Sequence, residues 1–155
     1  MNKIKIGDSK VLESRENPDG TMIRRRRVTA DGKRFTTYER IEMPSLIVIK
    51  SSGNKEQFDR DKLLTAVRRS VGKFFKTDME VENVVNKVVE RVYDFGNDEI
   101  ESRQIGLAIL DVLAEINEVA YVRFASVFLE FKTLEDFENI IRTQREESLR
   151  RRENI

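Results

Sequence analysis

The sequence predicts an α+β fold in which a small antiparallel β-sheet precedes a larger, mostly helical body with a short β element. Two turn-forming segments, PDG at residues 18–20 and ADGK at residues 30–33, divide the first 43 residues into β-favouring runs. A short apolar run, LIVI at residues 46–49, follows and is typical of a buried strand. Beyond Asp59, apolar residues recur at the i, i+3, i+4 spacing of helices.

The first 43 residues are predicted to form a three-stranded meander with strands near residues 10–14, 22–29 and 34–41. Alternation along the second strand places Arg24 and Arg26 on one face and Arg25 and Arg27 on the other. Residues 1–40 contain 11 basic and 6 acidic residues, a net charge of +5. The remaining 18 basic and 22 acidic residues give −4, so a positive segment joins a mildly negative body.

The body is predicted to contain five helices. The first two are expected at residues 59–75 and 80–93. The third begins after Ser102 as its N-cap, the fourth spans residues 119–131, and the last begins after Thr133 as its N-cap. The second helix contains six valines, which oppose helix propensity, so tertiary packing must hold it. The polar residues after 142 are expected to be a solvated helix end or a disordered tail.

The junctions around the apolar run carry lysines in positions suited to a phosphate ligand. Lys50 ends the expected strand, Gly53 and Asn54 supply turn chemistry, and Asp59 is a good N-cap for the next helix. Lys62 then falls in the first turn, where an ammonium opposes the helix dipole, so an anionic ligand explains it better than helix stability. The alternative is a solvated lysine on an exposed face.

Three segments together resemble a known family. VIK, Gly53 and KEQFDRDKLL resemble the opening of an ATP-cone, a small nucleotide-binding regulatory domain. KVLESR, IRRRR and KRFTTYER resemble the N-terminal segment of the NrdR family, bacterial repressors of ribonucleotide reductase genes, and VAYVRFASVFLEF resembles its last cone helix. The resemblance is collinear over roughly residues 1–140. It implies a zinc-ribbon-like head at 1–43, an ATP-cone at 44–142 and a polar tail at 143–155.

The family's head is a zinc ribbon with two cysteine pairs, whereas this chain has no cysteine and no histidine. Lys3 and Ile6 stand at the first pair of ligand positions, with Val28 and Asp31 the nearest counterparts of the second. A structural zinc site needs four soft or imidazole ligands, so we expect no zinc. Ile6 and Val28 suggest a small apolar core, which is weak support for a domain of about 40 residues.

The resemblance also implies a site for ATP or dATP, with Mg²⁺, bound as an effector. Val48 and Lys50 would lie along the nucleotide, and Lys50 and Lys62 would reach its phosphates. Glu56 would sit near the base or the ribose, where a polar group can separate nucleotides by hydrogen bonding.

Two further nucleotide contacts, Tyr121 and Arg123, are implied on the fourth helix, although Tyr121 equally suits an ordinary core position. The family usually has an arginine where this chain has Ser51, and loss of that fork-shaped cation should weaken phosphate affinity or change the number of nucleotides bound. Lys55 is a candidate replacement.

The arginines of the head are candidate DNA-binding residues, because phosphate contacts dominate DNA affinity and guanidinium suits them. The alternative is that they solubilise a strand edge. Base readout cannot be assigned from the sequence. The candidate residues are Arg15, Arg24, Arg25, Arg26, Arg27 and Arg34.

No catalytic residues emerge, because His and Cys are absent and no phosphate-binding glycine motif is present. The hypothesis is a cytoplasmic, homo-oligomeric repressor that binds an operator in double-stranded DNA under nucleotide control, without a membrane-spanning segment. The first rival is a nucleotide sensor that has lost DNA binding and acts through protein contacts. The second is a reductase subunit or accessory factor, which has no need of a basic head.

Overall fold

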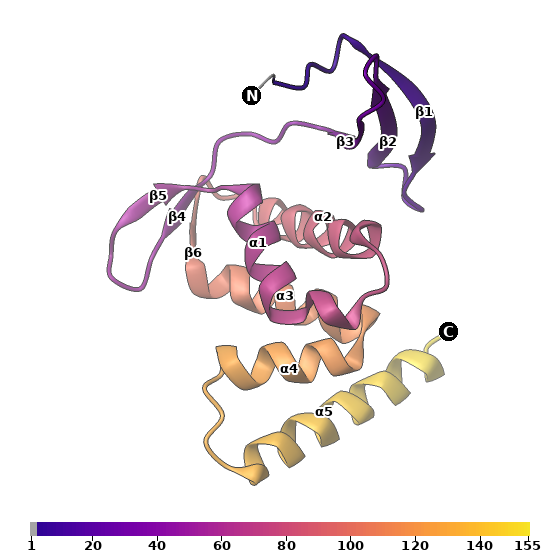
Figure 1. Ribbon diagram of the computed structural model, residues 1–155. Coiled ribbons are helices and arrows are strands. Elements are labelled where there is room, and N and C mark those ends of the chain that lie inside the picture. Colours follow the sequence, from indigo (N-terminus) through magenta and orange to yellow (C-terminus); the bar gives the residue numbers. More distant parts are fainter. Residues whose placement is uncertain (1–2) are drawn as a thin grey trace. The chain divides into compact units, whose positions relative to one another are not determined.

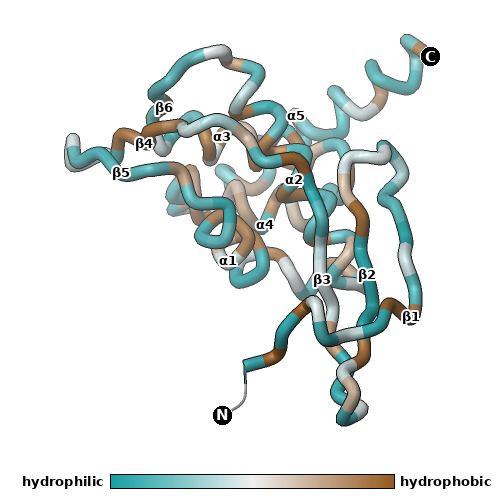
Figure 2. Tube along the Cα trace, turned by 90° about the horizontal axis from the view of Figure 1, so that it is seen from above, coloured by the Kyte–Doolittle hydropathy of each residue, from teal (hydrophilic) through white to brown (hydrophobic). Residues whose placement is uncertain are grey.

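The computed structural model describes residues 3–155. The chain divides into two compact units, Met1–Pro44 and Ser45–Ile155 (Figure 1). The first unit, the head, contains β1 (Ser9–Glu16), β2 (Met22–Thr29) and β3 (Arg34–Arg40) in the order β1-β2-β3, with both neighbouring pairs antiparallel. This confirms the predicted meander. Gly20 and Gly32 take positive φ angles of 70° and 84° in the two connections, a conformation that glycine adopts at little cost. Figure 2 shows mainly hydrophilic residues along much of β1 and β2.

The second unit, the body, opens with a three-stranded sheet in the order β5-β4-β6. The central strand β4 (Ile47–Ile49) pairs antiparallel with β5 (Lys55–Gln57) and parallel with β6 (Glu99–Glu101). Neither outer strand was expected, because each contains at most one apolar residue. Ile100 forms β6 by packing in the core beside Val48, its partner in the pairing register.

Five helices complete the body. They are α1 (Arg60–Val71), α2 (Asp78–Asp94), α3 (Ser102–Ile116), α4 (Glu118–Phe128) and α5 (Leu134–Glu153). The six valines of α2 are all buried and explain why a valine-rich segment is helical: burial outweighs propensity. A capping box fixes the start of α2, since Thr77 N–H donates to Glu80 Oε2 (3.0 Å) and Glu80 N–H donates to Thr77 Oγ1 (3.3 Å).

Three predicted helix details differ from the structure. The fourth helix ends at Phe128, so the expected end at residue 131 is wrong. The first helix ends at Val71 and a 3-10 helix follows from Gly72 to Phe74, so the expected end at residue 75 is wrong. Ser102 is the first residue of α3 rather than its cap; Glu101 caps it, donating its N–H to Gln104 Oε1 (3.0 Å).

The tail beyond residue 142 is helical through Glu153 and is not wholly solvated. Gln144 is buried, and its Nε2 donates to the backbone oxygen of Ala114 at the end of α3 (2.8 Å). Thr133, as predicted, caps this last helix. Within residues 3–155, no helix combines the length and the apolar character that crossing a membrane requires.

Candidate functional site

Two lysines of the body converge on one carboxylate. Lys50 Nζ lies 3.1 Å from Glu56 Oε2, and Lys62 Nζ lies 3.2 Å from the same oxygen. We call these three residues the lysine cluster. Lys50 follows β4, Glu56 is in the middle of β5, and Lys62 is in the first turn of α1, so the hairpin and the helix start bring the two cations together.

Local hydrogen bonds fix the two ends of the lysine cluster. The turn between β4 and β5 closes when Lys50 N–H donates to Asn54 O and Gly53 N–H donates to Lys50 O, both at 2.8 Å. Asp59, as predicted, caps α1 and accepts hydrogen bonds from the backbone N–H groups of Asp61 (2.9 Å) and Lys62 (3.2 Å). The positions of both lysine backbones are therefore set by turn and cap chemistry.

Hydrogen bonds from Lys50 and then Lys62 hold the pKa of Glu56 below its ordinary value. The carboxylate is therefore ionised at neutral pH, and the cluster carries two positive charges and one negative charge. Its residues remain accessible to a ligand, because the side chains of Lys50 and Lys62 are 48% and 65% exposed and that of Glu56 is 34% exposed.

The other two predicted residues of this segment, Val48 and Lys55, lie on opposite faces of the sheet. Val48 is buried and is paired directly with Glu56, so these two side chains lie on the same face. Lys55 lies on the opposite face, where its Nζ is 2.7 Å from Glu99 Oε1. The structure thus brings Val48, Lys50, Glu56 and Lys62 to one side and does not bring Lys55 to them.

Tyr121 and Arg123 lie on α4. Tyr121 is partly buried against the core; burial, followed by the charges of Glu147 and Asp111, raises the pKa of its phenol. The charged groups acting on it therefore belong to α5 and α3 and not to the lysine cluster. Arg123 is exposed. The core alternative for Tyr121 agrees with this placement.

A buried polar contact between α1 and α2 was missed from the sequence. Arg60 Nη2 donates to Glu82 Oε2 (2.8 Å) and to Asn86 Oδ1 (2.7 Å), and the side chain of Glu82 is only 3% exposed. A detectable signal existed: Glu82 and Asn86 are four residues apart among the buried valines of α2, and a buried acid implies a cationic partner.

The pairing register of the head sorts its arginines between two faces, as predicted for Arg24 to Arg27. Arg24 is paired with Arg15, and Val28 with Arg34, so Arg15, Arg24, Arg26 and Arg34 share one face. We call this the four-arginine face. Glu13 lies there too, 2.6 Å from Arg15 Nη2 and 4.0 Å from Arg24 Nη1.

The other two arginines are engaged within the head. Arg25 pairs with Glu39, and Arg27 donates through Nε to Thr37 Oγ1 (3.2 Å) and through Nη1 to Ser9 Oγ (3.1 Å). Their guanidinium groups therefore link the three strands across this face.

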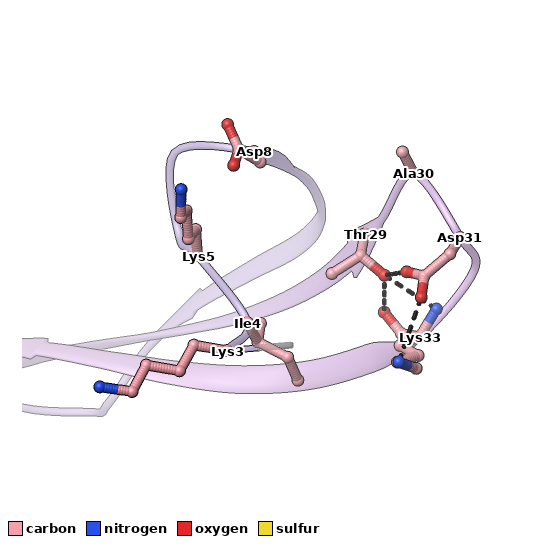
Figure 3. A pocket seen from close by; sticks show the side chains of 8 residues that line it. All are labelled: Lys3, Ile4, Lys5, Asp8, Thr29, Ala30, Asp31 and Lys33. Carbon is pink, nitrogen blue, oxygen red and sulfur yellow. Dashed lines mark hydrogen bonds and ion pairs between the residues drawn. The ribbon is translucent and has the colours of Figure 1, made fainter. Parts of the chain in front are cut away.

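One end of the head is hollowed, with a volume of about 510 Å³, between residues 3–8 and the β2–β3 turn (Figure 3). Three lysines line it, as do Asp8 and Asp31. Asp31 is bound within its own turn: Thr29 Oγ1 donates to it, Lys33 Nζ lies 3.2 Å from its Oδ2, and these two contacts lower its pKa.

The apolar core expected from Ile6 and Val28 is not formed as predicted, since Ile6 is 57% exposed. Within residues 3–44, the buried apolar side chain is Met22, which is 1% exposed. Its N–H is bound by Asn17 Oδ1 (3.0 Å), and Asn17 is itself buried. The sequence reasoning followed the positions of the family's ligands and so overlooked this residue.

Two family models match the chain along its length. The ATP cone domain matches residues 46–134, and the N-terminal domain of the NrdR-like transcriptional repressors matches residues 5–39. Together with the fold, these matches define an ATP-cone protein with a ribbon-type N-terminal domain.

Similar proteins match this chain over most of its length. Transcriptional repressor NrdR of Streptococcus sanguinis is 42% identical over 135 residues, covering 86% of each chain. The protein of the same name from Streptococcus gordonii is 44% identical, covering 88% of this chain and 89% of the relative, and that of Rhizobium rhizogenes is 44% identical, covering 86% and 85%. The chain belongs to the NrdR family.

The zinc ion implied by the name of the ribbon does not fit the side chains of this head. Neither Cys nor His occurs in the sequence. The hollow of the head includes Lys3 and Asp31, two of the positions that correspond to the family's zinc ligands, and its three lysines repel a cation. Of its two carboxylates, Asp31 is already engaged by Thr29 and Lys33. No group of three or more acidic residues able to hold a metal occurs among residues 3–155.

Proposed function

We propose that the protein is a cytoplasmic transcriptional repressor of ribonucleotide reductase genes that senses ATP or dATP. The observation that carries this proposal is the convergence of Lys50 and Lys62 on one point within the segment matched to the ATP cone. A basic head matched to the NrdR N-terminal domain precedes it. Relatives of this chain are named repressors and not enzymes, which favours a nucleotide acting as an effector.

In this proposal the lysine cluster receives the phosphates of the nucleotide. Two ammonium groups within hydrogen-bonding distance of one oxygen are spaced to bind oxygens of one phosphate chain. Mg²⁺ would accompany the triphosphate and offset part of its charge. Val48 lines the same face of the sheet, whereas Tyr121 and Arg123 would contribute from α4 only to a more extended ligand position.

The four-arginine face is proposed to contact the DNA backbone. Arg26 and Arg34 are exposed, and Arg15 has a side chain that is 69% exposed, so these cations are available to phosphates. Arg25 and Arg27 are assigned a supporting role, because their contacts bind β1, β2 and β3 to one another.

The head is proposed to act without zinc, on the ground that the chain supplies no thiolate or imidazole ligand. Nucleotide binding is proposed to select a homo-oligomer in which several heads align on operator DNA. Alignment matters because one small head binds weakly, and a nucleotide shifts the assembly only through its different affinities for the two states. The proposed domain bounds remain 1–43, 44–142 and 143–155.

An operator-binding assay with the full chain at low salt, with and without dATP and with ATP in parallel, tests the function. The expected result is salt-sensitive binding whose affinity changes with the nucleotide. Equal, salt-insensitive retention in all three conditions would contradict a nucleotide-controlled repressor.

Variants of the head test the assigned DNA face. Replacing Arg26 and Arg34 by Gln should lower the slope of log affinity against log salt by about 2, because each lost phosphate contact removes roughly 0.9. The matched control replaces two exposed arginines of α5, Arg145 and Arg150, by Gln; it removes the same charge from the body and should leave that slope nearly unchanged. An unchanged slope in the arginine variant favours the rival in which the head no longer binds DNA.

A further inference from the structure

We propose that Glu56 competes with the phosphates of the nucleotide for Lys50 and Lys62. Its carboxylate binds both lysines when no nucleotide is bound and must release them to phosphate. Glu56 therefore limits nucleotide affinity. This inference rests on the proposed nucleotide site and assigns to Glu56 a role different from reading the base or the ribose. The feature that carries it is the single oxygen, Oε2, shared by both ammonium groups.

The backbone dictates this shared contact. Glu56 is paired directly with Val48, which places its carboxylate on the face of the sheet toward which the buried Val48 side chain points. Lys50 lies two residues beyond Val48, at the start of a turn closed by its own backbone. Lys62 approaches from the capped start of α1. Glu56 therefore lies between two cations that belong to different elements.

Competition follows from the chemistry of the donors. Each lysine offers one compact positive charge, and a carboxylate oxygen and a phosphate oxygen are acceptors of the same kind for it. A triphosphate bound to both lysines would lie next to the ionised carboxylate of Glu56, and the two negative charges would repel each other. Binding therefore requires Glu56 to turn away or to remain at an electrostatic cost, and either one lowers the affinity for phosphate.

The same sheet provides a matched control. On its opposite face, Lys55 Nζ lies 2.7 Å from Glu99 Oε1, in an ion pair whose side chains are 56% and 47% exposed. Removing the charge of Glu99 changes the net charge of the protein as much as removing that of Glu56. It does so without changing the lysine cluster, so a general effect of net charge can be separated from competition at the site.

Calorimetric titration of the full chain with inorganic tripolyphosphate tests the proposal, because this probe has phosphates and no base or ribose. Glu56→Gln should bind tripolyphosphate about three- to fivefold more tightly than the unaltered chain, the upper part of the range for a contact between exposed charges, because Glu56 contacts two lysines. The gain should shrink as salt rises, since screening shortens the range of exposed charges. Glu99→Gln should change the affinity by less than about twofold.

Parallel titrations with ATP separate the competitor role of Glu56 from the nucleotide site itself. One outcome is that the unaltered chain binds ATP, but Glu56→Gln and the unaltered chain bind tripolyphosphate equally tightly. This outcome overturns the competitor role of Glu56 and leaves the nucleotide site standing. If the unaltered chain binds neither ligand, the proposed function and the inference fail together. Glu56→Asp gives a second measurement: its shorter side chain should hold the lysines less well and bind tripolyphosphate with intermediate affinity.

Discussion

Lys50 and Lys55 lie only five positions apart on one hairpin, yet their surroundings differ. Lys50 shares the oxygen of Glu56 with Lys62, whereas Lys55 points to the other face and pairs with Glu99. Strand alternation causes this division, because successive side chains of β5 leave opposite faces. A nucleotide that reaches the lysine cluster would therefore interact with Lys62 and not directly with Lys55.

Replacing Lys62 by Gln should weaken ATP binding by about tenfold or more, because a hydrogen bond to a charged group is worth roughly 1.5–3 kcal/mol. Calorimetry at constant salt measures this change. Lys55→Gln removes the same charge from the opposite face and should change the affinity far less. Equal losses in the two variants would mean that ATP responds to net charge and not to the lysine cluster.

The stability of α5 should depend on acid through Asp136. Its carboxylate accepts hydrogen bonds from the N–H groups of Lys132 (2.8 Å) and Thr133 (2.9 Å), which hold its pKa below the ordinary value of 3.8. Because the folded pKa is lower than the unfolded one, the stabilisation is complete above 3.8 and is lost as pH falls through the folded value.

The measurement is urea unfolding of the unaltered chain and of Asp136→Asn across acid and neutral pH. Their difference in unfolding free energy should be constant near neutrality and should shrink below pH 3.8. A difference that grows on acidification would mean that Asp136 is not stabilised as a carboxylate.

At the scale of elements, α3 and α4 pack closely at Gly106. A Cβ atom there would lie 2.1 Å from the nearest ring carbon of Phe128, which leaves no room for a methyl group unless the ring moves. The ring is held by stacking on Phe124 (centroids 5.7 Å apart) and by Arg103, whose guanidinium carbon lies 5.7 Å from its centroid. Gly106 thus sets the spacing of the two helices.

Alanine at residue 106 should destabilise the body by about 1 kcal/mol, because overpacking costs roughly 1–3 kcal/mol and the gain in helix propensity returns only about 0.5–1 kcal/mol. Urea unfolding of Gly106→Ala measures the loss. In a Phe128→Ala background the same change should become stabilising, since the clash is gone. Destabilisation of equal size in both backgrounds would place the cause elsewhere.

The sequence predicted the elements whose signals are local. The strands of the head were placed to within two residues, because turn residues separate them, and Asp59 and Thr133 were correctly assigned as caps. Strands β5 and β6 were missed because their polar composition gives no strand pattern; they form by pairing with β4. The capping role of Ser102 was wrong because Gln104 binds the backbone one residue earlier.

The candidate site was predictable in part for the same reason. The spacing of strand, turn and helix indicated that Lys50 and Lys62 would meet, and the structure brings them to one atom. That this atom belongs to Glu56 depends on the register of β5, which the sequence does not determine. The Arg60 contact with α2 depends on how two helices pack, which is a tertiary property.

The two units differ in the contacts that stabilise them internally. The body has an extensive apolar core, whereas the described part of the head buries Met22 and relies on polar contacts within its sheet and turns. Domains of about 40 residues usually need a metal ion or a disulfide to be stable. Removing metal ions therefore tests directly whether the head is stable without zinc.

Treatment with a strong chelator should leave both the folding of the head and its DNA affinity unchanged. The measurements are circular dichroism and operator binding before and after treatment, with elemental analysis expected to find much less than one zinc per chain. A cysteine-containing NrdR relative treated in parallel serves as the control and should lose binding. Loss of binding by this chain on chelation would refute a metal-free head.

The absence of thiolates has a physiological consequence. A cysteine-ligated ribbon can be disabled by peroxide or by scarcity of its ion, because both remove the ligand-metal bonds that hold it. A head without sulfur ligands offers no such point of attack. In the proposed metal-free head, repression would then continue when zinc is scarce or when cysteine ligands are oxidised, and it would remain under nucleotide control.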